Sequence, residues 1–225
     1  YGTQTVLGTQ EHLKNPSITN IKNYQKTYYV PNNMAICLSG DFDPDEMVAV
    51  IEKYFGQMQP NKDLPEITLT TSSVIESPAE KDVYGLDAEN VMIGWKYPGA
   101  KSEDALVAEV AASVLYNGSA GLIDLNINQQ QTVLEADGMS YSRPDAGELI
   151  LMGNPKQGQT LEEVRDILLA EVAKLRNGEF DDAVLSGTVN NMKKMMMRSL
   201  EDNGRRADMF VQSFINGTDW ADEVA

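Results

Sequence analysis

The stretch VMIGWKYPGAKSEDALVAEVAASVL, residues 91–115, decides the fold class of this chain. From Val91 to Tyr97 apolar residues alternate with others, and this period of two predicts a strand with one buried face. A Pro-Gly pair then ends the strand. Ser102 stands where it can cap a helix, whose apolar residues recur on one face as far as Leu115. A strand followed at once by an amphipathic helix indicates a sheet with helices packed on it.

The sequence downstream of that unit predicts a hairpin and further helices. Two apolar stretches flank Arg143-Pro144-Asp145-Ala146-Gly147, which is typical of two antiparallel strands joined by a long loop. Thr160-Leu161-Glu162-Glu163 matches a capping box at a helix start, and Asn177-Gly178 matches a helix end. We therefore predict an α+β fold, with a mixed or antiparallel sheet packed against helices. The expected helices cover about 120–130, 161–175, 180–200 and 205–215, and the expected strands lie near 132–141 and 148–152.

The first third of the chain has a different order of elements. Residues 1–16 are polar and predicted to be irregular. A helix is expected from Ile18 to about Tyr29, with Ser17 or Thr19 as its N-cap. The apolar run Met34–Leu38 is bounded by turn residues, which predicts a short buried strand. A second helix is expected after Asp43, up to Phe55. Residues 57–82 contain three prolines among Asn, Ser and Thr, so we predict a linker there, with a possible short edge strand at 67–70.

Composition excludes several classes of function. The chain has 225 residues, 34 acidic and 18 basic side chains, and a formal net charge of −16. This balance argues against a nucleic-acid partner, because phosphate backbones require a positive surface. No run of 18 apolar residues occurs, so no membrane span is expected. Residue 1 is Tyr and no signal peptide follows it, so we expect the chain to be a piece of a longer protein.

No catalytic or metal site is predicted from motifs. One His and one Cys are present, whereas a structural zinc site uses four such ligands. Asp41-x-Asp43-x-Asp45 matches the start of a calcium loop, but Glu46 stands where that loop needs Gly. Asp43 and Pro44 are better explained as the cap and first residue of a helix.

Two further features have simpler explanations than chemistry. His12 lies beside Glu11, but a zincin motif needs a second His one helical turn away, so we interpret His12 as solvent-facing. The methionines at 192 and 195–197 invite a metal or partner-binding hypothesis. Met192, Met196 and Leu200 share a helix face, which favours packing in the core.

A series of short segments resembles the pitrilysin/insulinase family of zinc metallopeptidases. The resemblance covers nearly the whole chain and is most specific in the first sixty residues, where the segments follow one another in the family's order. The matching segments are Tyr1-Gly2, Leu7-Gly8-Thr9-x-Glu11-x-Leu13, Ile18-Thr19-Asn20-Ile21, Tyr28-Tyr29-Val30-Pro31-Asn32-Asn33-Met34, Leu38-Ser39-Gly40-Asp41-Phe42-Asp43, Tyr54-Phe55-Gly56, Gly118-Ser119-Ala120-Gly121-Leu122, Tyr141-Ser142 and Asn177-Gly178.

The resemblance implies the fold, metallohydrolase-like α+β domains that close in pairs around an unfolded peptide, and it also implies how the chain is divided. Residues 1–56 correspond to the C-terminal tail of one domain, 57–82 to a linker, and 83–225 to a second, non-catalytic domain. The family's zinc ligands lie upstream of Tyr1-Gly2, so none is carried over. Zinc is therefore expected in the parent protein, and this chain alone is expected to be inactive.

The family also has an Arg and a Tyr, in a partner domain, that help to bind substrate near the zinc. Tyr141 matches that Tyr by position, and the resemblance implies that it is a substrate-binding residue; the alternative is an ordinary strand residue. The Arg does not match, because Ile127-Asn128 stands where a Leu-Arg is expected. Either this domain does not complete the active site, or the pair is not used.

The functional prediction is a non-catalytic part of a pitrilysin-like zinc endopeptidase. It would form chamber wall and help to bind extended peptide, with the upstream catalytic domain and the peptide substrate as partners. The alternative is a family member without zinc that serves as a scaffold or activating subunit. Bacterial members of the family are frequently exported, so the resemblance alone points to the periplasm, and the residues themselves leave the compartment unknown.

Overall fold

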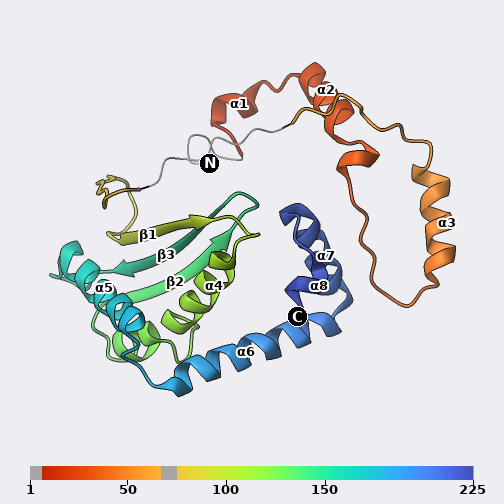
Figure 1. Ribbon diagram of the computed structural model, residues 1–225. Helices are drawn as coiled ribbons and strands as arrows, with labels where there is room; N and C mark the ends of the chain where they lie inside the picture. The colour runs from red at the N-terminus through yellow and green to blue at the C-terminus, as the bar shows by residue number, and fades with distance from the viewer. Residues whose placement is uncertain (1–6, 67–74, 225) are drawn as a thin grey trace. The chain divides into compact units, whose positions relative to one another are not determined.

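A computed structural model of the chain describes residues 7–66 and 75–224 (Figure 1). The chain divides into two compact units, with the division after residue 68. The possible edge strand at 67–70 lies outside the described residues. Helices alone make up the regular structure of the described part of the first unit: α1 Gln10–Lys14, α2 Ile18–Tyr28, the 3₁₀ helix η1 Pro31–Asn33 and α3 Pro44–Phe55.

The helix starts in the first unit follow the predicted capping residues. The Ser17 hydroxyl accepts from the backbone N–H of Asn20 at 3.2 Å, and α2 begins there. Asp43 Oδ1 accepts from the N–H groups of Asp45 and Glu46 at 2.9 and 3.1 Å, so its interpretation as the cap of α3 is confirmed. These carboxylate bonds satisfy two of the donors that every helix start leaves unpaired.

Two sequence predictions in the first unit are wrong. Residues 1–16 were expected to be irregular, but α1 forms within them, closed by a capping box between Thr9 and His12. Met34–Leu38 was expected to be a strand, but no strand is assigned there and the described residues offer it no partner. A strand exists only through hydrogen bonds to a neighbour, so an apolar run alone cannot form one.

The second unit contains a sheet and five α-helices among its described residues. Its α+β class is confirmed, and the sheet is wholly antiparallel, with strand order β1-β3-β2. The predicted hairpin is confirmed as β2 and β3, joined by residues 143–145. The elements are β1 Val91–Pro98, α4 Glu103–Leu115, the π-helix η2 Asp124–Asn128, β2 Glu135–Ser142, β3 Ala146–Asn154, α5 Leu161–Asn177, α6 Asp182–Glu201, α7 Asn203–Asn216 and α8 Trp220–Glu223.

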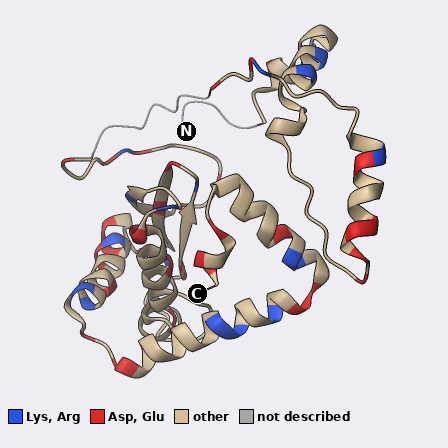
Figure 2. Cartoon of the chain, turned by 45° about the vertical axis from the view of Figure 1, so that its right-hand side comes forward, with Lys and Arg blue, Asp and Glu red and all other residues tan. Residues whose placement is uncertain are grey.

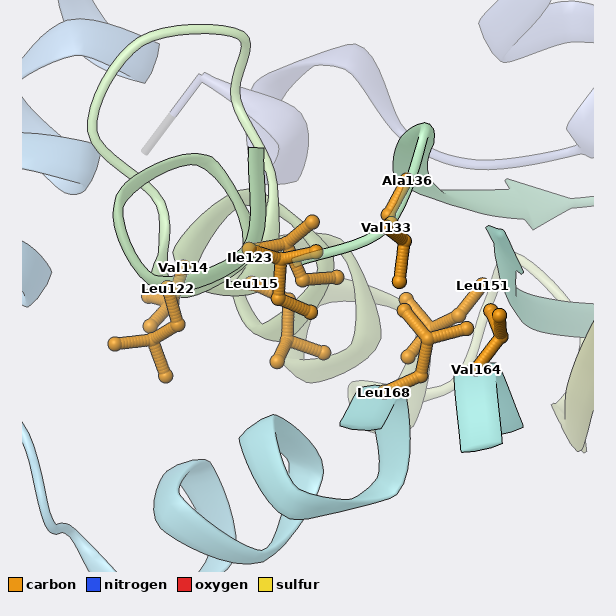
Figure 3. Packing of buried hydrophobic residues seen from close by; sticks show 10 residues of the cluster. Val114, Leu115, Leu122, Ile123, Val133, Ala136, Leu151, Val164 and Leu168 are labelled. Atoms are coloured by element: carbon orange, nitrogen blue, oxygen red, sulfur yellow. The ribbon is translucent and has the colours of Figure 1, made fainter. Parts of the chain in front are cut away.

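The core lies between one face of the sheet and helices α4 and α5 (Figure 3). A Cβ on Gly153 of β3 would stand 2.6 Å from Val164 Cγ1 of α5, so only glycine allows this close approach of helix and strand. Burial of each large aliphatic side chain contributes roughly 1.5–3 kcal/mol. The buried members of the core are Val114, Leu115, Leu122, Ile123, Ile127, Val133, Ala136, Leu151, Val164 and Leu168.

The opposite face of the sheet is open among the described residues of the second unit. Every second residue of each strand lies on this face, and several of these residues are exposed. Met92, Met139 and Tyr141 keep 59%, 44% and 56% of their full accessible area. Strand side chains point alternately to the two faces, so the buried alternates of the same strands face the helices. The sheet therefore presents one covered face and one accessible face.

The methionines of α6 divide between two environments. Met192, Met196 and Leu200 are half-buried, on the face that their spacing predicts. Met195 and Met197 are exposed by 51% and 68%. Figure 2 shows that the Asp and Glu residues, in red, occur on several helices of the chain.

Candidate functional site

Tyr141 lies at the end of β2, on the accessible face of the sheet. Its partner in the register is Glu148 of β3, and Lys96 of β1 is the next residue across the same row. Tyr141 is 56% exposed, so another molecule can reach this residue. The structure thus places the residue that the family resemblance selects where a ligand could reach it.

Arg143 holds a position beside this tyrosine. Its guanidinium carbon is 5.2 Å from the centroid of the Tyr141 ring, within cation–π range. Arg143 Nη1 also donates to Glu148 Oε1 at 2.9 Å. The three side chains form a connected group, in which Glu148 orients the guanidinium against the ring. Such a group can stack on a peptide and donate to a carbonyl oxygen, which is binding chemistry rather than bond breaking.

On the helix-facing side of the same end of the sheet, hydrogen bonds between hydroxyl groups link β1 to β2. The Tyr97 hydroxyl is 2.7 Å from Ser140 Oγ and 2.9 Å from Ser142 Oγ. A Cβ on Gly147 would overlap Tyr97 Cε2, so glycine is required for the ring to lie across β3. These contacts fix the backbone on both sides of Tyr141.

Asn128, which stands where the family resemblance expects an Arg, has a structural role. Its Nδ2 donates to the carbonyl oxygen of Ala136 at 2.8 Å, and its Oδ1 accepts from the N–H of Ala136 at 3.0 Å. The preceding Ile127 is 1% exposed. The two residues therefore anchor η2 to β2, and they do not belong to the Tyr141 group.

Asp137, also on β2, is the carboxylate with the least favourable surroundings near this surface. Its Oδ1 is buried and has no hydrogen-bond partner among the described residues. Burial raises the pKa of Asp137, and the nearby charge of Glu135 raises it further. Burial likewise raises the pKa of Tyr116, with smaller contributions from Asp124, Asp137 and Glu135.

Zinc ligation does not fit the residues that the structure describes. Within residues 7–66 and 75–224, no group of three or more His, Cys, Asp or Glu side chains could hold a metal ion. His12 is exposed, and its Nδ1 accepts from the N–H of Thr9 at 3.2 Å as part of the α1 cap. No helix in these same ranges is both long and apolar enough to cross a membrane.

Sequence reasoning selected Tyr141 but missed its partner Arg143. The signal in the sequence was that Arg143 stands two positions after Tyr141, because alternate residues at a strand end share a face of the sheet. That Glu148 lies opposite could only follow from the hairpin register, which the sequence left open within a few residues.

Comparison with known proteins identifies the family. The sequence pattern of the peptidase M16 inactive domain matches residues 17–192, most of the chain. The zinc protease PqqE of Helicobacter pylori is 23% identical over 226 residues, a match covering 95% of this chain and 50% of that protein. This chain thus spans about half the length of that curated relative.

Solved structures share the fold at low sequence identity. A protease from Helicobacter pylori superposes with a TM-score of 0.76 at 18% identity, over 94% of this chain and 52% of that one. The periplasmic protease PqqL from Escherichia coli gives a TM-score of 0.61 at 16% identity, over 94% and 24%. A chain of complex III2 from Candida albicans gives 0.68 at 16% identity, over 95% and 52%. With the family pattern covering residues 17–192, this chain belongs to the M16, or pitrilysin/insulinase, peptidase family, as an inactive-type domain.

Proposed function

We propose that this chain is the non-catalytic part of a pitrilysin-like zinc endopeptidase and helps to hold an extended peptide. The observation that carries the proposal is the accessible sheet face with Tyr141 exposed on it and Arg143 held against its ring. The zinc ion and the general base belong to a catalytic domain elsewhere in the parent protein. The net charge of −16 favours cationic peptides as ligands.

We propose the domain division on the same basis: residues 1–56 as the tail of a preceding domain, 57–82 as a linker and 83–225 as the second domain. The scarcity of a core in the first unit supports this. Val30 is its one buried hydrophobic residue among those described, whereas Ile18, Ile36 and Tyr54 are exposed by 65%, 45% and 69%. A unit that leaves its apolar residues exposed is expected to pack on another domain, here the catalytic one.

Peptide affinity of Tyr141 variants tests the proposed function. The full 225-residue chain is titrated with a fluorescent nine-residue peptide of alternating valine and threonine with a lysine at each end. Tyr141→Ala should weaken binding at least fivefold, because it removes both the ring and the hydroxyl. Tyr141→Phe separates the hydroxyl from the ring.

Tyr84→Ala is the matched control, because Tyr84 is 92% exposed in a loop of the same unit. It should bind the peptide as the unchanged chain does. Equal affinity of the Tyr141→Ala and Tyr84→Ala variants would contradict the role of Tyr141, and absence of any peptide binding would contradict the proposed function itself.

The second candidate function is a scaffold or activating subunit without zinc. It is supported by the fold likeness to the complex III2 chain. The two candidates differ in the parent gene: an endopeptidase has H-x-x-E-H and a later Glu in its catalytic domain, whereas the scaffold lacks them. A periplasmic location, as in the name of PqqL, is proposed here for the parent protein and is tested by fractionation of the source cells.

A further inference from the structure

The sequence contains four Asn-Gly pairs, and only one of the four asparagines lies outside a helix. A glycine after an asparagine favours deamidation, because no side chain hinders the attack of its nitrogen on the carboxamide. Asn177 and Asn216 end α5 and α7, and Asn203 begins α7. Asn117 stands two residues after the end of α4 and belongs to no helix or strand. Ring closure must turn the bond between Cα and the carbonyl carbon, which a helical backbone holds at one angle.

The nitrogens of the glycines that follow also differ. The N–H of Gly178 donates to the carbonyl oxygen of Leu175 at 3.1 Å, and that of Gly217 donates to Phe214 at 3.2 Å. The N–H of Gly118 has no acceptor among the residues that the structure describes. A Cβ built on Gly118 would meet no atom within 4 Å, so the space beside it is open. The nitrogen that would attack is therefore unpaired at this site and occupied at two of the others.

Hydrogen bonds hold the Asn117 carboxamide beside that nitrogen. Its Oδ1 accepts from the N–H groups of Ser119 and Ala120 at 3.2 and 3.0 Å, and its Nδ2 donates to the carbonyl oxygen of Ser113 at 3.0 Å. Bonds to N–H groups two and three positions later fold the carboxamide over the peptide group that joins Asn117 to Gly118. The same two donors stabilise the negative charge that develops on Oδ1 when the carboxamide carbon is attacked.

We propose that Asn117 is a site of spontaneous deamidation in the folded chain, with water as the co-reactant. The Gly118 nitrogen loses its proton to hydroxide and bonds to Cγ of Asn117. The Cγ–Nδ2 bond breaks, and Nδ2 takes a proton from water and leaves as ammonia.

Water then opens the succinimide that this step forms. Cleavage between the Gly118 nitrogen and Cγ leaves aspartate, whereas cleavage between that nitrogen and the main-chain carbonyl carbon of residue 117 leaves isoaspartate. Each complete event consumes one water and releases one ammonia. The reaction requires no ligand and no other part of the parent protein.

The modification would affect the packing of the second unit. The Asn117 N–H donates to Oδ2 of the buried Asp124 at 3.0 Å, and the same oxygen accepts from the N–H of Gly121 at 2.9 Å. These bonds tie the end of α4 to the start of η2, and the adjoining Leu122 and Ile123 belong to the core. Isoaspartate adds one carbon atom to the main chain within this loop. Asp124 can then no longer accept both bonds in the same geometry, so the aged chain should be less stable.

Peptide mapping by mass spectrometry tests the proposal on the full 225-residue chain, aged in buffer at neutral and at mildly alkaline pH. Aspartate and isoaspartate should accumulate at Asn117 at least tenfold faster than at the other three asparagines. The rate should rise with pH, because the Gly118 nitrogen must lose its proton before it attacks. Labelling by an isoaspartyl methyltransferase distinguishes isoaspartate from aspartate.

The same chain aged in urea is the matched control. Unfolding removes the helices and the hydrogen bonds of Asn117, so the four pairs should then react at similar rates. A preference for Asn117 that persists unchanged in urea would overturn the proposal, because the selection would then come from the local sequence and not from the fold. Equal rates at all four asparagines of the folded chain, or a faster reaction at a helical one, would overturn it as well.

Two glutamine variants connect the modification with stability. Asn117→Gln should not react at this position, because glutamine would have to close a larger ring, and its melting temperature should not fall with age. Asn177→Gln should age as the unchanged chain does. Each variant is compared with its own fresh sample, so a lower starting stability of Asn117→Gln does not affect the comparison. An equal fall of melting temperature in aged Asn117→Gln and in the aged unchanged chain would contradict the assignment of ageing to Asn117.

Discussion

At the scale of single residues, the buried polar groups of this chain differ in whether they have a hydrogen-bond partner. Asp124 is buried, and its Oδ2 accepts from the N–H groups of Asn117 and Gly121 at 3.0 and 2.9 Å. Glu171, also buried, is bonded to Lys174 at 2.7 Å and to Asn126 at 2.8 Å. Asp137 differs, because its buried oxygen lacks a partner among the described residues. Buried charge without a partner destabilises a fold.

Asp137→Asn should therefore stabilise the chain at neutral pH. The pKa of Asp137 is raised above its ordinary 3.8, first by burial and then by Glu135, so the folded state holds the proton more tightly than the unfolded state. The associated stability is complete below pH 3.8 and is lost as the pH rises through the raised pKa. Because Asp137 is only partly buried and solvent screens its charge, we expect a gain of no more than about 0.5 kcal/mol at pH 7 that vanishes toward pH 3.5, measured by urea unfolding.

Glu135→Gln provides the matched comparison for that measurement. It removes the second cause of the raised pKa and should recover part of the same gain. If Asp137→Asn lowers stability at pH 7, the carboxylate has a favourable partner in solution and its interpretation as unpartnered is wrong.

At the scale of elements, the close contact of β3 with α5 and α4 stabilises the second unit. Leu151 of β3 is fully buried in the cluster that these helices share. Neither helix could bury its apolar face alone, because isolated helices of this length are marginal in water. The sheet provides the apolar surface on which both helices pack. This packing in turn fixes the register of the strands.

Leu151→Ala should lower the free energy of unfolding by about 2–5 kcal/mol, since it removes buried methyl groups and leaves a cavity. Chemical denaturation followed by circular dichroism measures the change. Met92→Ala, on the accessible face of β1 and 59% exposed, is the control and should cost less than about 0.5 kcal/mol. Similar losses in the two variants would mean that the two sheet faces are not distinguished as described.

At the scale of the whole molecule, the chain combines a second unit that has its own core with a first unit that has almost none. The described residues of the first unit contribute one buried hydrophobic residue, Val30, and those of the second contribute twelve. This asymmetry is the observation on which the proposed domain division rests. The chain spans about half the length of its matched relative. Under the proposed function, peptidase chemistry would belong to the parent protein rather than to residues 1–225.

The purified 225-residue chain should accordingly bind no stoichiometric zinc and hydrolyse no peptide. The physical reason is that its described residues contain no group of side chains able to ligate the ion. Inductively coupled plasma mass spectrometry of the dialysed chain, together with a quenched-fluorescent peptide assay, measures both properties. One tightly bound zinc per chain with measurable hydrolysis would refute the assignment as a non-catalytic part.

Much of the fold could be predicted because its signals are local. The caps at Ser17, Asp43 and Thr160 precede the helices that they were expected to start. The alternation after Val91 became β1, and the loop after Tyr141 became a hairpin connection. Each depends on residues a few positions apart, which the chain keeps together whatever the rest of it does.

The same local reasoning was wrong at Met34–Leu38, where an apolar run was interpreted as a strand. Apolar composition sets a preference, but strand formation depends on a partner that the described chain does not offer. Thr9 shows the opposite case, because its capping box with His12 uses an imidazole in place of the usual Glu and was not recognised in the sequence.

The sequence by itself determined the α+β class, most helix starts, the hairpin, the family and the choice of Tyr141, because these depend on periodicity, capping chemistry and ordered short motifs. Only the tertiary structure decided that Arg143 and Glu148 surround Tyr141, that Asn128 anchors η2 to β2, and that Asp137 lacks a partner. Those features depend on strand register and on contacts between segments that are distant along the chain. Such contacts are selected by packing of the whole core and not by any short stretch of residues.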